Sequence, residues 1–552
     1  MLDLIIKGGR IVDGTGRPAF DGDVAIEKGA IAAIGTIGTD AHQVIDARGR
    51  VVAPGFIDPH THFDVQLLWD GAARPAIEHG VTTVVPGNCS LSLAPLKAAD
   101  RRALVGMFQQ IEELPPAAFT EAFEWTWEGF GGYVDALKKN LAVNVAPLVG
   151  HSVIRLWVMG DAAQKRSATR DETAAMQDLL RECLEAGAVG LSTSFVDVDE
   201  KMHPVPSRYA YWAELDALSK VLGEYGRMLQ VVPEFYATDL TIARIDQLAE
   251  LSLKYNIPTT FSPLFDSAAT PDNVPRTMAR VEEQFARGAR VWPQVQTRPI
   301  DISFSFEQAS LFFLATPIWY MILRLPRDQR LAALRSEDTC KALVDAAEPG
   351  GDTTRFAHLT VRDSRDASLV GRTLGAIATE RGTTPAGAMI ALSLEEDLGV
   401  HFLAANLGHE ETSRVGPILA NDLVHVGASD AGAHIQSFAT YGDTGYLLSE
   451  FVRQGGHLTL EHAVKKITGD TARIWNLPNR GLLRPGHAAD VVVFDPERIA
   501  RGAELPACDM PEGGMRYVRN ASGVDTVLVN GQVVYTAADG YSDALPGTLA
   551  TI

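Results

Sequence analysis

The sequence predicts an α/β protein built on a TIM-like (β/α)8 barrel, with one insertion and a small β domain that both chain ends form together. Three observations carry this prediction. Apolar strand-like runs alternate with helical patterns through the middle of the chain, which is typical of a parallel sheet covered by helices. Short strands separated by glycines occupy both ends, and a His-x-His pair closes the first run of the middle section.

The two chain ends, residues 1–53 and 478–552, are predicted to be all-β. Strand-like runs cover 4–6, 9–12, 23–26 and 31–34 near the start, and 489–495 and 524–534 near the end. The Asn530-Gly531 pair predicts a hairpin, because both residues accept the positive φ that a two-residue turn requires. We expect one composite β domain here, with a structural role.

Residues 54–477 are predicted to form the barrel. Its apolar runs lie at 81–85, 143–149, 189–192, 228–232, 259–262, 290–293 and 423–428, with helices over 171–184 and 207–223 between them. The alternation stops at about 298–375, which we interpret as an insertion. That segment holds an aromatic group followed by a charged helical stretch; the aromatic residues are Phe304, Phe306, Phe312, Phe313, Trp319 and Tyr320.

Composition excludes several classes of partner. The formal charge is −20, from 49 basic and 69 acidic residues, so the surface as a whole repels nucleic acid and anionic membranes. The four cysteines lie far apart, which fits a reducing compartment better than a disulfide scaffold. The first residues lack a secretory pattern, and no apolar stretch reaches membrane-spanning length. We therefore expect a cytoplasmic protein without nucleic-acid or membrane partners; homo-oligomerisation is left open.

His60 and His62 are the first candidates for chemistry. They follow the apolar run 51–57, and alternate residues of a strand point to the same face, about 6.5–7 Å apart. Two imidazoles placed in this way can chelate one ion. The alternative is a pair of solvated histidines.

Residues 54–62, Pro-Gly-Phe-Ile-Asp-Pro-His-Thr-His, resemble the first-strand motif of the amidohydrolase superfamily. Residues 79–89, which end in Gly-Asn-Cys, resemble its N-acyl-D-amino-acid deacylase (D-aminoacylase) branch. The resemblance implies hydrolysis of an amide bond by attack of metal-bound water. It also implies that the terminal β domain is a small sandwich and that the insertion serves as a lid or substrate wall; ordinary packing of its aromatic residues is the alternative.

Two further ligands follow from the resemblance. Cys89 matches the metal-binding cysteine of this branch, and a thiolate suits zinc; a buried thiol that only packs is the alternative. Asp430 matches the aspartate after the eighth strand, which implies a metal ligand and proton shuttle: a carboxylate beside the activated water can take its proton and pass it to the leaving nitrogen. An N-cap role is the alternative for Asp430.

Two residues are candidates for substrate binding. His151 lies in Gly-His-Ser-Val-Ile-Arg, residues 150–155, which resembles a segment that the branch places after the third strand. It is expected to donate to a substrate oxygen, with a purely structural histidine as the alternative. Arg298 follows the seventh apolar run, where its guanidinium is suited to pair with a carboxylate.

The resemblance fails at two positions. The family places one metal-binding histidine after the fifth strand and another after the sixth, but this chain has no histidine from Pro204 to Ala357. Glu234 falls where the fifth-strand ligand belongs, and a carboxylate can hold zinc; a solvated loop carboxylate is equally consistent. No lysine ends the fourth strand, which excludes a carbamylated-lysine bridge.

The sequence therefore predicts a metal-dependent amidohydrolase that acts on a small-molecule amide, most simply an N-acyl-D-amino acid. About one zinc ion per chain is expected, with another divalent metal as the alternative. Hydrolysis of a cyclic amide or dipeptide-like compound is the second hypothesis. A ligand-binding pseudoenzyme with a decayed metal site is the third.

Overall fold

The computed structural model describes residues 1–121, 123–307, 310–313, 316–435 and 437–550. The chain divides into two compact units. The first comprises Met1–Arg298, Glu411–Ile435 and Ala439–Ile552, and the second comprises Pro299–Glu410 and Gln436–Phe438. No helix among the described residues is both long and apolar enough to cross a membrane. The predicted cytoplasmic location stays a prediction.

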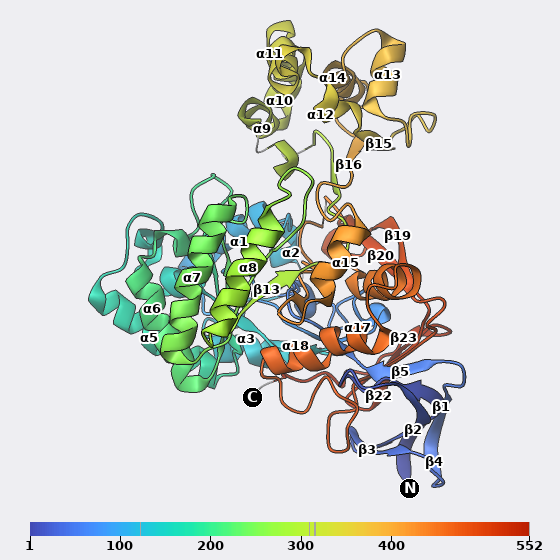
Figure 1. Ribbon diagram of the computed structural model, residues 1–552. Helices are drawn as coiled ribbons and strands as arrows, with labels where there is room; N and C mark the ends of the chain where they lie inside the picture. Colours follow the sequence, from blue (N-terminus) through green and yellow to red (C-terminus); the bar gives the residue numbers. More distant parts are fainter. Residues whose placement is uncertain (122, 308–309, 314–315, 436, 551–552) are drawn as a thin grey trace. The chain divides into compact units, whose positions relative to one another are not determined.

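Both chain ends contribute to one nine-stranded sheet in the first unit (Figure 1). Its order is β23-β22-β21-β18-β5-β1-β2-β3, with β4 paired to β1. The strands are β1 (Leu2–Ile11), β2 (Phe20–Glu27), β3 (Ala30–Gly35), β4 (Ala41–Asp46), β5 (Val51–Pro54), β18 (Val491–Phe494), β21 (Val524–Val529), β22 (Gln532–Thr536) and β23 (Gly540–Tyr541). The Asn530-Gly531 turn joins β21 to β22 as an antiparallel hairpin, as the sequence predicts.

Two parallel sheets carry the strand ends that matter for the site. The smaller has the order β6-β7-β8 and the larger β17-β13-β12-β11-β10-β9. The strands are β6 (Phe56–Asp58), β7 (Val81–Val84), β8 (Asn144–Val145), β9 (Leu148–Gly150), β10 (Gly190–Ser194), β11 (Met228–Val232), β12 (Thr259–Phe261), β13 (Val291–Val295) and β17 (His425–Val426). Every run that the sequence assigns to a middle strand overlaps one of these strands.

The run 143–149 forms two short strands rather than one. Pro147 separates β8 from β9 and has no N–H to donate to a ladder. The first half pairs with β7 and the second half with β10. Leu148 N donates to Pro86 O at 2.9 Å, so this one segment connects the two parallel sheets.

Helices follow the strands in sequence and cover them. Figure 1 shows α5, α6, α7 and α8 side by side. The α-helices of this unit are α1 (Arg101–Ile111), α2 (Ala117–Thr120), α3 (Phe130–Leu137), α4 (His151–Met159), α5 (Arg170–Glu185), α6 (Trp212–Tyr225), α7 (Thr238–Tyr255), α8 (Asn273–Ala286), α15 (Thr412–Ala420), α16 (Asp443–Tyr446), α17 (Leu460–Ile467) and α18 (Gly469–Ile474). Thr169 and Glu172 form a capping box that fixes the start of α5.

The second unit has its own core. Its antiparallel sheet has the order β14-β16-β15, with β14 (Ile302–Phe304), β15 (Thr360–Asp363) and β16 (His401–Ala404). Its α-helices are α9 (Pro317–Leu323), α10 (Arg327–Leu334), α11 (Glu337–Ala347), α12 (Thr354–Ala357), α13 (Leu374–Arg381) and α14 (Pro385–Glu395). Aromatic side chains of the predicted insertion pack against one another in this unit. The rings of Phe313 and Trp319 are stacked, with their centroids 5.1 Å apart, and both side chains are buried.

Candidate functional site

Two histidine rings converge just beyond the carboxyl end of β6. His60 and His62 flank Thr61, which makes a parallel bridge to Ala431. The bridge keeps the chain extended, so both rings project to the same side and their centroids lie 5.5 Å apart. Both side chains are almost fully buried.

The Nδ1 atom of each ring lies next to a side-chain oxygen of another residue. His60 Nδ1 lies 2.8 Å from Gln294 Oε1, and His62 Nδ1 lies 2.9 Å from Glu112 Oε1. A metal-binding histidine commonly presents its second nitrogen to such an oxygen, which fixes the ring and its tautomer. The two Nε2 atoms are therefore left to face a common point.

A thiol and a carboxylate face the same point. Cys89 Sγ lies 3.5 Å from His60 Nε2 and 3.7 Å from His62 Nε2, and Asp430 Oδ1 lies 3.2 and 3.4 Å from these two atoms. Cys89 and Asp430 both have left-handed backbones, with φ of 54° and 58°. Such conformations cost free energy and persist only where their surroundings impose them, which is common at functional sites.

These distances fit a metal ion. Nitrogen, sulfur and oxygen donors about 2.0–2.3 Å from a tetrahedral zinc ion lie about 3.3–3.8 Å from one another. The observed separations, 3.2–3.7 Å, agree with that spacing. Within the described ranges, His60, His62 and Cys89 form a group whose ligand atoms all lie within 4.8 Å of one another; Asp430 is not part of this group, although its Oδ1 lies 3.2 and 3.4 Å from the two imidazole nitrogens. Two imidazoles, a thiolate and a carboxylate are ligands that zinc accepts.

The side chains of the cluster shift one another's pKa values. Burial opposes protonation of His60, but the neighbouring Cys89 and Asp430 raise its pKa to about 10. Burial raises the pKa of Asp430, but the hydrogen bonds and charges of His60 and His62 outweigh this effect and hold the pKa well below its usual value. Asp430 is therefore ionised at neutral pH.

Two buried carboxyl groups connect the segments that carry the cluster. Asp58 Oδ2 accepts a 2.7 Å hydrogen bond from Ser429 Oγ, next to Asp430. Asp64 Oδ2 accepts a 3.0 Å bond from Gly87 N, two residues before Cys89. Burial raises the pKa of each to about 7.

Glu234 does not belong to this cluster. Its carboxylate pairs with the Arg244 guanidinium, with Oε1 2.7 Å from Nη2 and Oε2 3.3 Å from Nε. Glu234 follows β11, as the sequence predicts, but in this structure its carboxylate forms an ion pair with Arg244.

His151 lies at the start of α4 with both ring nitrogens in contact with protein atoms. Nε2 lies 2.8 Å from Glu214 Oε1, and Nδ1 lies 3.0 Å from Thr193 Oγ1. Arg155 pairs with the other oxygen of Glu214. The ring is buried, and its donors and acceptors are used within the fold.

Arg298 lies behind the loop that carries Asp430. Its Nε lies 3.0 Å from Asp443 Oδ2, and its Nη2 donates to Ser429 O at 2.5 Å. Asp443 Oδ1 also accepts from Thr297 N at 2.8 Å. In this structure the guanidinium pairs with a carboxylate of the protein itself, and a role of Arg298 in substrate binding stays a prediction.

The sequence reasoning missed Glu112 and Gln294. Glu112 follows the last residue of α1 in an irregular segment, and no local pattern marks it. Gln294 lies in the otherwise apolar strand β13, and a lone amide in a buried strand is a signal that could have been used.

Comparison with known proteins identifies the class of this chain as a hydrolase acting on carbon–nitrogen bonds. The family model described as amidohydrolase family matches residues 43–228 and 329–535. These ranges make up more than half of the chain, so the protein belongs to the amidohydrolase family. The resemblance predicted from its motifs is confirmed.

Similar proteins extend over almost the full length. A D-aminoacylase and an N-acyl-D-aspartate deacylase, both of Alcaligenes xylosoxydans xylosoxydans, are 30% and 31% identical to it; the matches cover 97% of this chain and 94% and 92% of the two relatives. The crystal structure of an N-acyl-D-glutamate deacylase from Bordetella bronchiseptica, complexed with zinc and a phosphonate inhibitor, matches with a TM-score of 0.69, 27% identity and complete coverage of both chains.

Proposed function

We propose that this protein is a metal-dependent deacylase of N-acyl-D-amino acids. The observation that carries the proposal is the approach of Cys89 Sγ and Asp430 Oδ1 to the Nε2 atoms of His60 and His62, at 3.2–3.7 Å. The named deacylases among the similar proteins support the substrate class.

We infer that these four side chains hold one divalent ion, with zinc first. When bound, such an ion polarises a carbonyl and lowers the pKa of water. The support for a single ion is the donor set: Glu234 is paired with Arg244, and no histidine lies between Pro204 and Ala357.

Asp430 is the proton carrier in this proposal. Its ionised carboxylate accepts a proton from the attacking water and passes it to the amide nitrogen, which is a poor leaving group until protonated. Gln294 and Glu112 keep the two rings oriented. Arg298 holds Ser429 O, the carbonyl next to Asp430, and therefore acts as a positioning residue.

The same proposal covers the wider architecture. Two connections support closure of the parallel strands into a (β/α)8 barrel. Segment 144–150 joins the two sheets on one side. On the other side, His62 N donates to Ala431 O and Asp430 N donates to His60 O. Ile57, Leu148, Met228 and Trp292, from strands of both sheets, belong to one apolar cluster, as side chains inside a barrel do. The β-rich chain ends are proposed as its companion domain, and the second unit as the insertion that serves as a lid.

A substrate panel tests the activity. N-acyl-D-amino acids, their L forms and cyclic amides are offered to the zinc-loaded protein, and release of amine or ring opening is measured. Faster cleavage of the D forms supports the proposal. Activity confined to cyclic amides favours the second hypothesis, and a folded, zinc-loaded protein that cleaves nothing favours a pseudoenzyme.

A further inference from the structure

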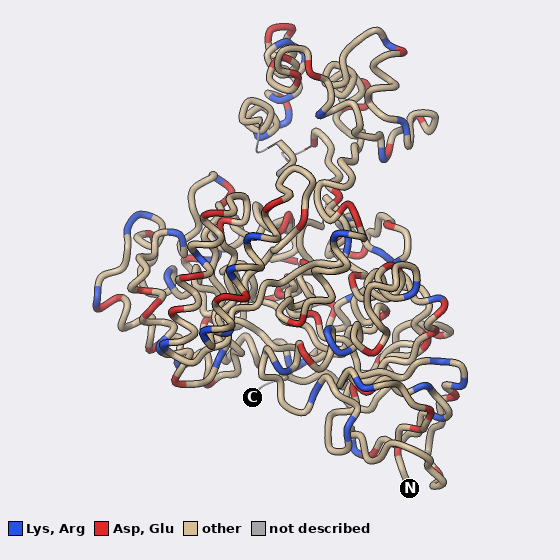
Figure 2. The backbone as a smooth tube through the Cα atoms, viewed as in Figure 1, with Lys and Arg blue, Asp and Glu red and all other residues tan. Residues whose placement is uncertain are grey.

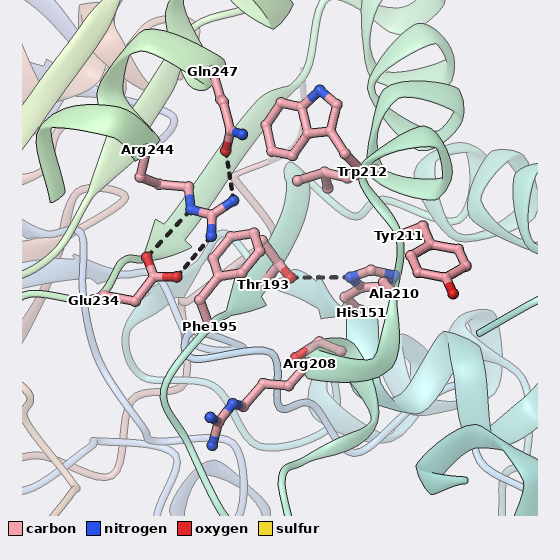
Figure 3. A pocket seen from close by; sticks show the side chains of 12 residues that line it. His151, Thr193, Phe195, Arg208, Ala210, Tyr211, Trp212, Glu234, Arg244 and Gln247 are labelled. Atoms are coloured by element: carbon pink, nitrogen blue, oxygen red, sulfur yellow. Dashed lines mark hydrogen bonds and ion pairs between the residues drawn. The ribbon is translucent and has the colours of Figure 1, made fainter. Parts of the chain in front are cut away.

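A pocket lies at the carboxyl ends of β9, β10 and β11, and its lining does not include His60, His62, Cys89 or Asp430. Its volume is about 320 Å³, and helices α6 and α7 contribute to its wall. Figure 3 shows its lining, which combines the aromatic side chains of Phe195, Tyr211 and Trp212 with the cations Arg208 and Arg244. Parallel α/β folds place their ligand-binding residues at this edge of the strands.

Most charges of this pocket are neutralised by neighbours. Arg244 pairs through two nitrogens with Glu234, and its guanidinium lies 3.4 Å from the centroid of the Phe195 ring (Figure 3). His151 is engaged by Glu214 and Thr193. These side chains form a fixed wall and offer little charge to a ligand.

Arg208 is different. Its Nη1 donates to Val196 O at 2.9 Å and to Asp197 O at 3.1 Å, which anchors one corner of the guanidinium. Among the described residues, none supplies a hydrogen-bond partner for its Nε or Nη2, and none places a carboxylate within 4.0 Å of it. A guanidinium is always charged and presents a planar fork to carboxylates. An arginine left unpaired in a pocket of a protein with net charge −20 therefore indicates an anion site.

We propose that this pocket binds a carboxylate carried by a flat, apolar group, with the open edge of Arg208 paired to the carboxylate and the aromatic side chains in contact with the flat group. The assignment of this carboxylate to the substrate rests on the proposed function, but the proposal that the pocket binds a carboxylate is independent of it. The segment that anchors Arg208 also reaches the ligand cluster: burial raises the pKa of Asp197 to about 6, and the charges of Glu112 and His62 act on the same carboxyl group.

Benzoate and benzamide are matched probes, since they share a ring and differ in the charged group. Binding of each is measured by calorimetry to the full-length zinc-loaded protein, to Arg208→Gln and to Arg17→Gln. Arg17 is exposed and lies outside the pocket, so this control matches the change in net charge. His60→Ala/His62→Ala is the fourth protein, because a carboxylate can also bind zinc.

We expect benzoate to bind the parent about tenfold or more tightly than benzamide, since a hydrogen-bonded ion pair contributes that much. Arg208→Gln should lose this preference, while Arg17→Gln and the double histidine variant keep it. Arg208→Lys, which keeps the charge without the planar fork, should fall between the parent and Arg208→Gln; this variant decides the matter if Arg208→Gln does not fold.

Equal affinity for the two probes, or an unchanged preference in Arg208→Gln, would overturn the proposal. Benzoate binding that disappears with the two histidines would place the anion at the ligand cluster and overturn it as well. None of these measurements needs turnover, so a protein that binds benzoate through Arg208 but cleaves no N-acyl-D-amino acid would refute the proposed function alone.

Discussion

Replacing Glu112 by alanine tests whether the cluster is a metal site held from outside. The carboxylate oxygen lies 2.9 Å from His62 Nδ1, and both side chains are 1% exposed, so the contact is shielded from solvent in the parent protein. Removing a group that orients a ligand typically costs 10–100-fold in metal affinity. The expected loss is therefore about 1.4–2.8 kcal/mol of zinc-binding free energy.

The assay is competition for zinc between the protein and a chromophoric chelator. Glu112→Gln keeps an oxygen beside His62 but removes the charge, so its loss should be smaller than that of Glu112→Ala. Glu121→Ala removes an exposed carboxylate elsewhere and serves as the control. If Glu112→Ala bound zinc as tightly as Glu121→Ala, the orienting role of Glu112 would have to be abandoned.

Three further changes have expected outcomes. Asp430→Asn should retain zinc in elemental analysis but lose about 10²- to 10⁴-fold in turnover, because it cannot carry the proton; near-parental turnover would assign the proton to another residue. Arg298→Met should lower the free energy of unfolding in urea by about 3–5 kcal/mol, because it leaves the Asp443 carboxylate buried without its partner; a loss below about 1 kcal/mol would contradict this. Burial lowers the pKa of His425 to about 3, so below about pH 6.5 the unfolded chain binds a proton at this residue that the folded chain does not bind. The free energy of unfolding of the parent, relative to that of His425→Gln, should therefore decrease as the pH falls from 7 to 5. A difference that stays constant over this range would refute the prediction.

Local patterns predicted the middle strands because each is short, apolar and buried on both faces. The run 228–232 is β11 residue for residue, and the run 81–85 ends one residue beyond β7. The run 143–149 was predicted as one strand because most of its side chains are apolar. The structure divides it, because Pro147 lacks the N–H that a continuous ladder needs.

The sequence revealed the candidate ligands that belong to short local motifs. His60 and His62 share one extended segment after β6; Cys89 belongs to the motif after β7 and Asp430 to the motif after β17. Glu112 could not be found in this way, because the fold brings it to His62 from a segment 50 positions later in the printed sequence.

Glu234 shows the opposite difficulty. Its position after β11 is where the family has a ligand, and position was the only information that the sequence offered. The charge that neutralises it comes from Arg244, one turn and a half into α7, and helical periodicity does not reveal which strand-end residue a helix side chain will reach.

Activity measured during a zinc titration is the most direct test of metal-dependent amide hydrolysis at this cluster. Metal-free protein is given zero to two equivalents of zinc, and cleavage of an N-acyl-D-amino acid is followed beside His60→Ala/His62→Ala. The account predicts no turnover without zinc, a rise that is complete near one equivalent, and none in the double variant. Turnover in the metal-free protein, or in the variant at one equivalent, would contradict it.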